Sequence, residues 1–175
     1  VRNKDFQLAL FKSQEIPIVP TWIPRKENRI FGKGPWVLKL FRGNQGKGLM
    51  HIENPDTLND VLNTFSLMGD ERVLVQSFRD LPEYRAFFLA GEIRIFKRED
   101  LKNRQGSEVY LKPKHLLIIE RAFKIVGAHY GALDFFLDDE LEVLELNLVP
   151  GFSDVEALTG ENWVLRFLNE FKTKY

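Results

Sequence analysis

The stretch that decides the fold is Gly131-Ala-Leu-Asp-Phe-Phe-Leu-Asp-Asp-Glu-Leu-Glu-Val-Leu-Glu-Leu-Asn-Leu-Val-Pro-Gly151. Two apolar runs flank a polar turn, which predicts a β-hairpin. Because side chains alternate across a strand, Glu145 and Asn147 lie on one face. Asp134 joins them if the turn sets the matching register. Three oxygen ligands without histidine or cysteine suit Mg²⁺ rather than zinc, and Mg²⁺ usually shares its coordination shell with substrate phosphates. The hairpin therefore indicates nucleotide chemistry.

Asp134 and Asn147 both interrupt apolar strand runs. A polar group buried there carries a desolvation cost unless it is paired or bound to a metal. We therefore interpret the two residues as metal ligands, and the alternative is a buried structural pair. The three histidines (His51, His115 and His129) are scattered and are interpreted as structural or surface residues.

Composition limits the other functions. The chain has 175 residues, 44% of them hydrophobic, with 25 lysines and arginines against 25 aspartates and glutamates. Such a chain is globular, and it has no bulk charge for binding nucleic acid or an anionic membrane. Cysteine is absent, which excludes disulfides, zinc–cysteine sites and thiol catalysis. No run is long or apolar enough to span a bilayer.

The pattern of apolar residues mixes helices and strands without strict alternation, which predicts an α+β fold of two lobes. Helices are expected at 3–14, from Asn54 and Pro55 onwards, at 115–129 and at 161–175, with strands at 16–24, 36–41, 49–52, 72–78, 84–90 and 93–98. Residues 100–113 are polar and predict an irregular, mobile loop. A capping box at Ser153–Glu156 predicts a further helix start.

A glycine-rich turn, Arg42-Gly-Asn-Gln-Gly-Lys-Gly48, lies between two of these strands. Its glycines let backbone N–H groups converge on an anion, which favours a flexible cover over phosphates. It lacks the ending of a Walker motif, and an ordinary hairpin turn is the alternative. Lys39, in the apolar strand just before it, suits a phosphate oxygen, or else is an edge-strand lysine with a solvated head.

A predicted strand ends at Gln76-Ser77-Phe78, where exposed backbone could bind an adenine edge, and Glu83 could then accept a ribose hydroxyl. The next hairpin carries cations. By alternation Arg94 and Arg98 share one face of it. A solvated surface is the alternative reading of these arginines.

Taken in order, the motifs resemble the ATP-grasp superfamily, and most closely its RimK-like amino-acid ligases. The resemblance rests on these segments: Arg2-Asn-Lys4, Val37-Leu-Lys39-Leu, Gly43-Asn-Gln-Gly46-Lys-Gly48, Val75-Gln-Ser-Phe78, Glu83-Tyr-Arg85, Lys97-Arg98, Leu133-Asp134-Phe, Leu144-Glu145-Leu-Asn147 and the tail from Pro150 to Gly160. It implies ATP held between two α+β lobes with antiparallel sheets. The first would be residues 1–76, with the leading helix and the glycine-rich loop, and the second residues 77–175, with the Mg²⁺ site.

The resemblance also implies roles for individual residues. Lys4 and Lys39 would contact phosphates, and Gly43, Gln45, Gly46 and Gly48 would cover them. Gln76, Ser77 and Phe78 would line the adenine site, and Glu83 the ribose. Asp134, Glu145 and Asn147 would hold Mg²⁺, with Mn²⁺ as a substitute. Arg85 and Arg98 would be the catalytic residues that meet the transferred phosphate or the substrate carboxylate.

The chain departs from the family pattern at three places. Ser77 stands where the hinge usually has an acidic residue, and the acceptor loop is reduced to the segment from Asn103 to Glu108. We also expect the amino-terminal domain of most members to be missing before Val1.

The implied activity is ATP-dependent carboxylate–amine ligation through an acyl-phosphate, in the cytoplasm. Its substrates would be a small carboxylate and an amine, such as an amino acid and the C-terminus of a peptide or protein, and an oligomer is compatible with it. The alternative is a non-catalytic or partner-dependent ATP-binding module.

Overall fold

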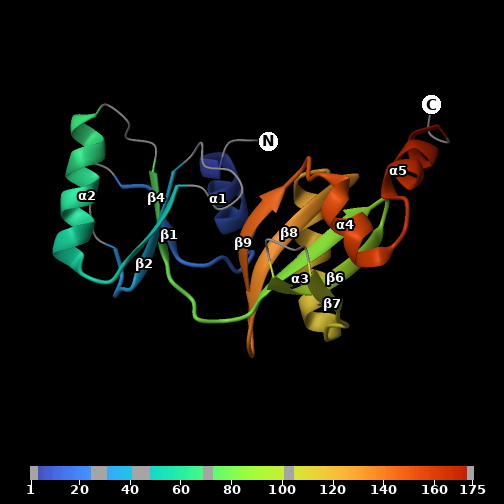
Figure 1. Cartoon of the computed structure of the whole chain (residues 1–175), viewed down its shortest axis with the longest axis horizontal. Helices are drawn as coiled ribbons and strands as arrows, with labels where there is room; N and C mark the ends of the chain where they lie inside the picture. Colours follow the sequence, from blue (N-terminus) through green and yellow to red (C-terminus); the bar gives the residue numbers. More distant parts are fainter. Residues whose placement is uncertain (1–3, 25–30, 41–47, 69–72, 101–104, 173–175) are drawn as a thin grey trace. The chain divides into compact units, whose positions relative to one another are not determined.

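The computed structural model describes residues 4–24, 31–40, 48–68, 73–100 and 105–172. Five helices are present in these ranges: α1 (Lys4–Ser13), α2 (Pro55–Leu67), α3 (Pro113–Ile125), α4 (Phe152–Thr159) and α5 (Trp163–Lys172). The strands are β1 (Thr21–Trp22), β2 (Trp36–Leu40), β3 (Leu49–Ile52), β4 (Val73–Ser77), β5 (Glu83–Leu89), β6 (Glu92–Asp100), β7 (Gln105–Glu108), β8 (Tyr130–Leu137) and β9 (Leu141–Asn147). They form two antiparallel sheets (Figure 1), so the α+β class is confirmed.

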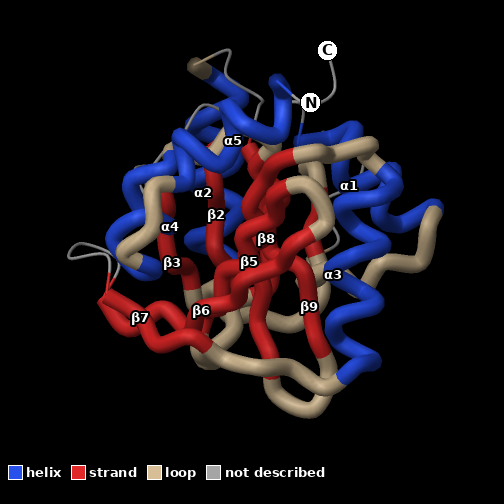
Figure 2. Tube along the Cα trace, turned by 90° about the vertical axis from the view of Figure 1, so that its right-hand side faces the viewer, coloured by secondary structure: helices blue, strands red, loops and turns tan. Residues whose placement is uncertain are grey.

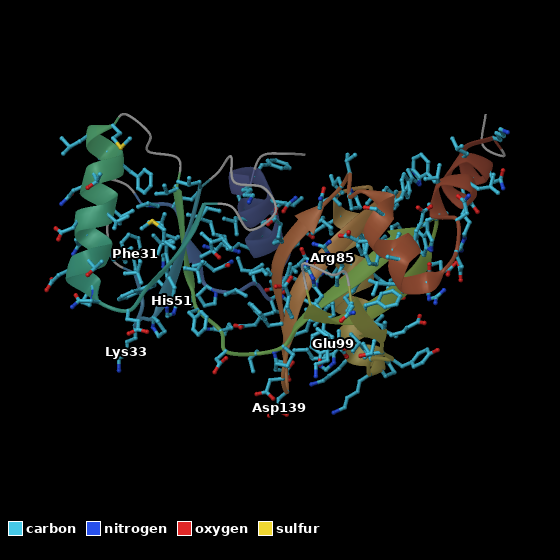
Figure 3. All side chains as sticks on the ribbon, viewed as in Figure 1. Phe31, Lys33, His51, Arg85, Glu99 and Asp139 are labelled. Atoms are coloured by element: carbon cyan, nitrogen blue, oxygen red, sulfur yellow. The ribbon has the colours of Figure 1, made fainter. Side chains whose placement is uncertain are left out.

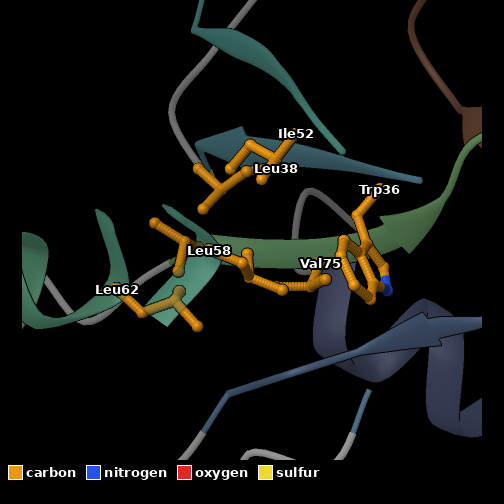
Figure 4. Packing of buried hydrophobic residues seen from close by; sticks show 7 residues of the cluster. Trp36, Leu38, Ile52, Leu58, Leu62 and Val75 are labelled. Carbon is orange, nitrogen blue, oxygen red and sulfur yellow. The ribbon is translucent and has the colours of Figure 1, made fainter. Parts of the chain in front are cut away.

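The first sheet belongs to a compact unit of residues 18–80 and has the strand order β1-β4-β2-β3. Helix α2 begins as expected, since the Asn54 side chain accepts a hydrogen bond from the Asp56 amide at 2.7 Å and Pro55 takes the first helical turn. The helix packs Leu58 and Leu62 against Trp36, Leu38 and other buried residues of the sheet (Figure 4). Alternation along β2 then directs Lys39 to the face opposite Leu38.

The second sheet lies in the other unit, residues 1–17 and 81–175, with the strand order β7-β6-β5-β8-β9. Helix α3 covers one face, where Phe88 stacks on Phe123 with ring centroids 4.7 Å apart. Helices α4 and α5 cover the other face (Figure 2), and there Phe87 meets the fully buried Trp163. Because helices cover both faces of this sheet, apolar side chains of β5 and β8 are buried on each face in alternation.

The leading helix differs from expectation, because the division of the chain places α1 with residues 81–175 and not with the first lobe. Gln7 is nearly buried, and its side-chain amide donates to the carbonyl of Leu146 at 2.7 Å and accepts from the Leu146 amide at 3.3 Å. The carbonyl of Pro17 accepts from the Val143 amide at 2.8 Å. Helix α1 and the segment after it therefore satisfy the open edge of β9 (Figure 1).

Two further expectations were wrong. The segment 100–113 is not irregular throughout, because strand β7 pairs Ser107 with Lys97 on β6. Gly106 makes this close pairing feasible, since a Cβ atom there would lie 2.5 Å from the Lys97 carbonyl oxygen. The capping box at Ser153 is absent as well. Helix α4 begins two residues earlier, with Gly151 as its N-cap and no side-chain cap hydrogen bond.

Candidate functional site

The β8–β9 hairpin has the register that the proposed metal ligands require. Asp134 lies directly opposite Glu145, and Ala132 lies opposite Asn147. Residues separated by two along a strand share a face. The carboxylates of Asp134 and Glu145 and the amide of Asn147 therefore project from the same side of the sheet. A bulge between Asp134 and Phe135 follows this pair, and such irregularities re-aim side chains at functional sites.

Arg85 on β5 pairs with Asp134 across the sheet and binds it in a bidentate ion pair. Its Nε lies 2.5 Å from Oδ1 and its Nη2 lies 2.7 Å from Oδ2. Both side chains are largely buried, at 18% and 13% exposure. Removing one partner of such a pair leaves an uncompensated buried charge, which costs about 3–5 kcal/mol. Arg85 (labelled in Figure 3) is therefore held firmly in this conformation.

Glu83 and Arg98 extend the same group of charges. Arg98 Nη1 lies 2.5 Å from Glu83 Oε1 and 3.7 Å from Asp134 Oδ1. Burial raises the pKa of Glu83, the charge of Asp134 raises it further, and Arg98 offsets part of the shift. The resemblance assigned Glu83 to the ribose. The structure places it beside the proposed catalytic and metal-binding side chains, and its ribose role stays a prediction.

Lys4, at the start of α1, reaches Glu145 with its Nζ 3.4 Å from Oε1. The contact depends on α1 lying along β9, which the bonds between Gln7 and Leu146 secure. A proposed phosphate ligand and a proposed metal ligand are thus paired with each other. The same is true of Arg85 and Asp134.

One member of this group was not anticipated from the sequence. Asp154, in the first turn of α4, accepts a hydrogen bond from Arg85 Nη1 at 3.0 Å. The sequence pattern offered Asp154 only as a residue within a capping box, and no spacing rule connects it to Arg85, which lies 69 residues earlier. We call the seven side chains of Lys4, Glu83, Arg85, Arg98, Asp134, Glu145 and Asp154 the charged cluster.

The donors on β8 and β9 fit Mg²⁺. The site offers two carboxylates and one amide oxygen, and Mg²⁺ is usually held by one or two carboxylates together with substrate phosphates and water. Asn147 Oδ1 accepts from the Val149 amide at 3.0 Å, which leaves its second lone pair for a ligand. Each Asp134 oxygen likewise accepts one strong hydrogen bond from Arg85 and keeps further acceptor capacity. Within the described ranges, no group of three or more His, Cys, Asp and Glu side chains could hold a metal by itself.

The remaining predicted nucleotide ligands lie in the unit of residues 18–80. The Gln76 side chain is 4% exposed and donates to Thr21 Oγ1 at 2.9 Å, so it faces the interior of that unit. The backbone amides of Ser77 and Phe78 donate to the carbonyls of Pro20 and Pro35, each at 2.9 Å. An adenine base at this strand end would therefore have to form its hydrogen bonds with groups other than these two N–H donors.

The other predicted ligands of that unit are Lys39, Gly48 and the loop glycines. Lys39 is partly exposed on β2, and Gly48 has a φ of +80°, which suits glycine. Gly43, Gln45 and Gly46 lie outside the described residues. Their roles stay predictions.

Arg94 shares its face with Arg98 but belongs to a different set of contacts. It forms ion pairs with Glu108 on β7 and with Glu161 before α5, and Glu161 also binds Arg166 at 2.6 Å. These contacts fasten β7 and α5 to β6. Arg94 is therefore explained structurally, whereas Arg98 remains with the charged cluster.

Sequence comparison finds relatives with ligase names. The chain is 30% identical over 149 residues to a probable alpha-L-glutamate ligase of Psychromonas ingrahamii, an alignment that covers 75% of this chain and 48% of the relative. It is 24% identical to a probable alpha-L-glutamate ligase of Legionella pneumophila, with 99% of this chain and 64% of the relative covered. The chain thus spans about half to two thirds of the length of these relatives. No protein-family model matches it.

Solved structures give the same fold. The ATP-grasp ligase PsnB in complex with precursor peptide PsnA2 and AMPPNP matches with a TM-score of 0.71 at 20% identity, covering 88% of this chain and 51% of PsnB. PsnB with a minimal precursor, Mg and ADP matches with a TM-score of 0.70 at 19% identity, covering 91% and 54%. D-alanine–D-alanine ligase of Bacillus anthracis matches with a TM-score of 0.67 at 16% identity, covering 88% and 59%.

The chain therefore has the ATP-grasp fold, as its motifs predicted. Within that class its sequence is similar to probable alpha-L-glutamate ligases, which confirms the resemblance to RimK-like enzymes. Among the described helices, none combines the length and apolar character needed to cross a membrane.

Proposed function

We propose that this chain is the ATP-dependent core of a carboxylate–amine ligase that forms an amide bond through an acyl-phosphate. The observation that carries the proposal is the charged face of the β5–β6–β8–β9 sheet. Asp134 and Glu145 lie opposite each other beside Asn147, and Arg85, Arg98 and Lys4 lie among them. This arrangement of hard oxygen ligands and phosphate-binding cations suits a magnesium-bound triphosphate.

The reaction would need positioning and charge neutralisation rather than a protein nucleophile. An oxygen of the substrate carboxylate attacks the γ-phosphorus and ADP leaves. The amine nitrogen then attacks the acyl carbon, phosphate leaves, and the amine loses a proton. Holding reactants in orientation can supply about 7–11 kcal/mol. Mg²⁺, where bound, would offset charge on the phosphates.

The residues of this chain would divide the work. Asp134, Glu145 and Asn147 would hold the metal, for which Mn²⁺ can substitute, and Arg85 and Arg98 would meet the transferred phosphate or the substrate carboxylate. Lys4 and Lys39 would bind phosphate oxygens, with Gln45 and the glycines at 43, 46 and 48 covering them. Gln76, Ser77 and Phe78 would serve the adenine, and Glu83 a hydroxyl of the ribose. Use of ATP as a substrate supports a cytoplasmic location.

The relatives' names support substrates of a defined kind. Two relatives are named as probable alpha-L-glutamate ligases, and PsnB was solved with a precursor peptide. We infer that the amine or carboxylate partner of this chain is an amino acid such as glutamate, joined to a small acid or to the C-terminus of a peptide or protein.

The deciding experiment measures amine-dependent ADP release over a panel of amino acids and peptides. We expect the Glu145→Ala variant to lose ADP formation by at least about 100-fold, because loss of an outer-shell partner alone typically costs about 10–100-fold and Glu145 would bind the metal directly. Its circular dichroism spectrum should match the parent, since Glu145 is only partly buried. Unchanged turnover in Glu145→Ala would contradict the assignment of Glu145 as a metal ligand.

ATP binding without turnover would support a different function. Calorimetry can measure binding of ATP with Mg²⁺ independently of turnover. Binding of the nucleotide without ADP release from any acid and amine in the panel would identify a non-catalytic ATP-binding module, or one that needs a partner. That module is the alternative to a ligase.

A further inference from the structure

Asp154 has no part in the metal-binding and phosphate-binding roles assigned above. Its carboxylate is nevertheless bound to the most constrained cation of the charged cluster. Arg85 uses its Nε and Nη2 donors on Asp134 and its Nη1 donor on Asp154, the last at 3.0 Å. One guanidinium is therefore shared between a proposed metal ligand on β8 and a carboxylate on α4.

This sharing matters when a divalent cation binds Asp134. Both Asp134 oxygens face the Arg85 fork, so a metal ion entering the same carboxylate weakens that ion pair and repels the guanidinium. Arg85 is 18% exposed. Without Asp154, a guanidinium that loses Asp134 would be a buried cation with its desolvation cost no longer offset by this ion pair.

We propose that Asp154 is a positioning residue, which keeps Arg85 ion-paired and in place while Asp134 binds the metal ion. With Asp154 present, Arg85 keeps one strong charge-assisted hydrogen bond. Breaking the ion pair between Arg85 and Asp134 then costs less free energy. Arg85 also stays at the cluster, where it can meet a phosphate oxygen. This inference rests on the proposed metal site at Asp134, Glu145 and Asn147.

A simpler role would be local. Asp154 stands in the first turn of α4, where an acidic residue stabilises a helix through its dipole. In that case its loss would lower thermal stability slightly and leave metal binding unchanged. The two roles therefore separate when metal affinity is the measured quantity.

The test measures Mn²⁺ affinity by electron paramagnetic resonance on the whole chain with saturating ADP. We expect Asp154→Asn to raise the dissociation constant of Mn²⁺ about tenfold, within the usual range of coupling between neighbouring sites. Asp138→Asn is the matched control, because it removes the same charge from the exposed β8–β9 turn. It should leave the Mn²⁺ constant unchanged. Asp154→Ser provides a second variant if the first does not fold.

The same substitution in an Arg85→Gln background separates positioning from simple attraction. If Asp154 acts through Arg85, Asp154→Asn changes Mn²⁺ affinity less than twofold once Arg85 is neutral, because there is no longer a cation to retain. An equal loss of affinity in both backgrounds would show that only the charge of Asp154 matters, and the proposal would be overturned.

The outcomes also distinguish the two levels of inference. A parent protein that binds no Mn²⁺ in the presence of ADP contradicts the metal site, and with it both the proposed function and the role of Asp154. A parent that binds Mn²⁺ while Asp154→Asn binds it equally well contradicts the role of Asp154 alone.

Discussion

Removing the negative charge of Glu83 should stabilise the protein at neutral pH, although Glu83 is ion-paired with Arg98. Burial and the charge of Asp134 raise its pKa above the ordinary value of 4.5, despite the opposing effect of Arg98. A carboxyl group with a raised folded-state pKa stabilises the native state below its unfolded pKa, and this contribution is lost as pH rises through the folded pKa. Glu83→Gln, which cannot ionise, should therefore be more stable than the parent near about pH 7 and equal to it in acid.

Denaturant unfolding in EDTA across this pH range measures the effect. Glu108→Gln is the contrasting variant, because hydrogen bonding to Arg94 lowers the pKa of Glu108. Its stabilising contribution is present above the unfolded pKa and lost as pH falls, so Glu108→Gln should be the less stable protein at neutral pH. Glu83→Gln unfolding at lower denaturant than the parent at neutral pH would count against this account of the cluster.

At this scale the sequence was informative about the ligands and silent about their partners. The shared face of Asp134, Glu145 and Asn147 could be predicted, because side chains alternate along each strand of the hairpin. Their role as metal ligands stays a prediction. That Arg85 binds both Asp134 and Asp154 depends on where α4 packs on the sheet. No local pattern encodes that packing.

Gln7 holds helix α1 to the edge of β9, because its side chain bonds to both backbone groups of Leu146. Gln7→Leu keeps the size of the side chain but leaves a buried N–H and a buried C=O without partners. We expect the free energy of unfolding to fall by about 1–3 kcal/mol. Gln14→Leu, the same change at an exposed position just after the helix, should have little effect. Equal stability of the two variants would contradict the edge-capping role of Gln7.

The elements themselves were mostly predictable, and the exceptions have a common physical cause. Hairpin β8–β9 and helix α2 follow local rules of alternation and capping, and both are present as expected. Burial on α1 does not follow hydrophobicity alone, since Gln7 is buried together with Phe11 while Phe6 is 54% exposed. Strand β7 likewise exists because β6 offers it a partner. Long-range hydrogen bonding overrode local propensity in both cases.

Each of the two compact units buries apolar residues of its own, and each should respond to its own mutation. Leu38 and Leu133 are both fully buried, the first in the unit of residues 18–80 and the second in the other unit. Leu38→Ala and Leu133→Ala should each cost about 2–5 kcal/mol. In native-state hydrogen exchange, Leu38→Ala should reduce protection in α2 and β2–β4, and Leu133→Ala in β5, β8 and β9.

Helix α1 provides the decisive readout of this experiment. It precedes the unit of residues 18–80 in the chain but is assigned to the other unit. Its amides should therefore lose protection in Leu133→Ala and keep it in Leu38→Ala. Loss of α1 protection in Leu38→Ala alone would return the helix to the first lobe, where the sequence had placed it.

The pairing of cations with carboxylates in the charged cluster has a consequence for what the protein attracts from solution. Three basic side chains, Lys4, Arg85 and Arg98, stand against four carboxylates, Glu83, Asp134, Glu145 and Asp154, and the chain itself carries no net charge. Such a surface exerts little long-range pull on a polyanion. Metal-free nucleotide would have to compete with these carboxylates for cations that they already pair, whereas the magnesium chelate would bring a cation for the carboxylates and phosphates for the basic side chains. If the proposed metal site is correct, we expect the cluster to bind the chelate in preference to the bare anion, with an association rate that changes little with salt.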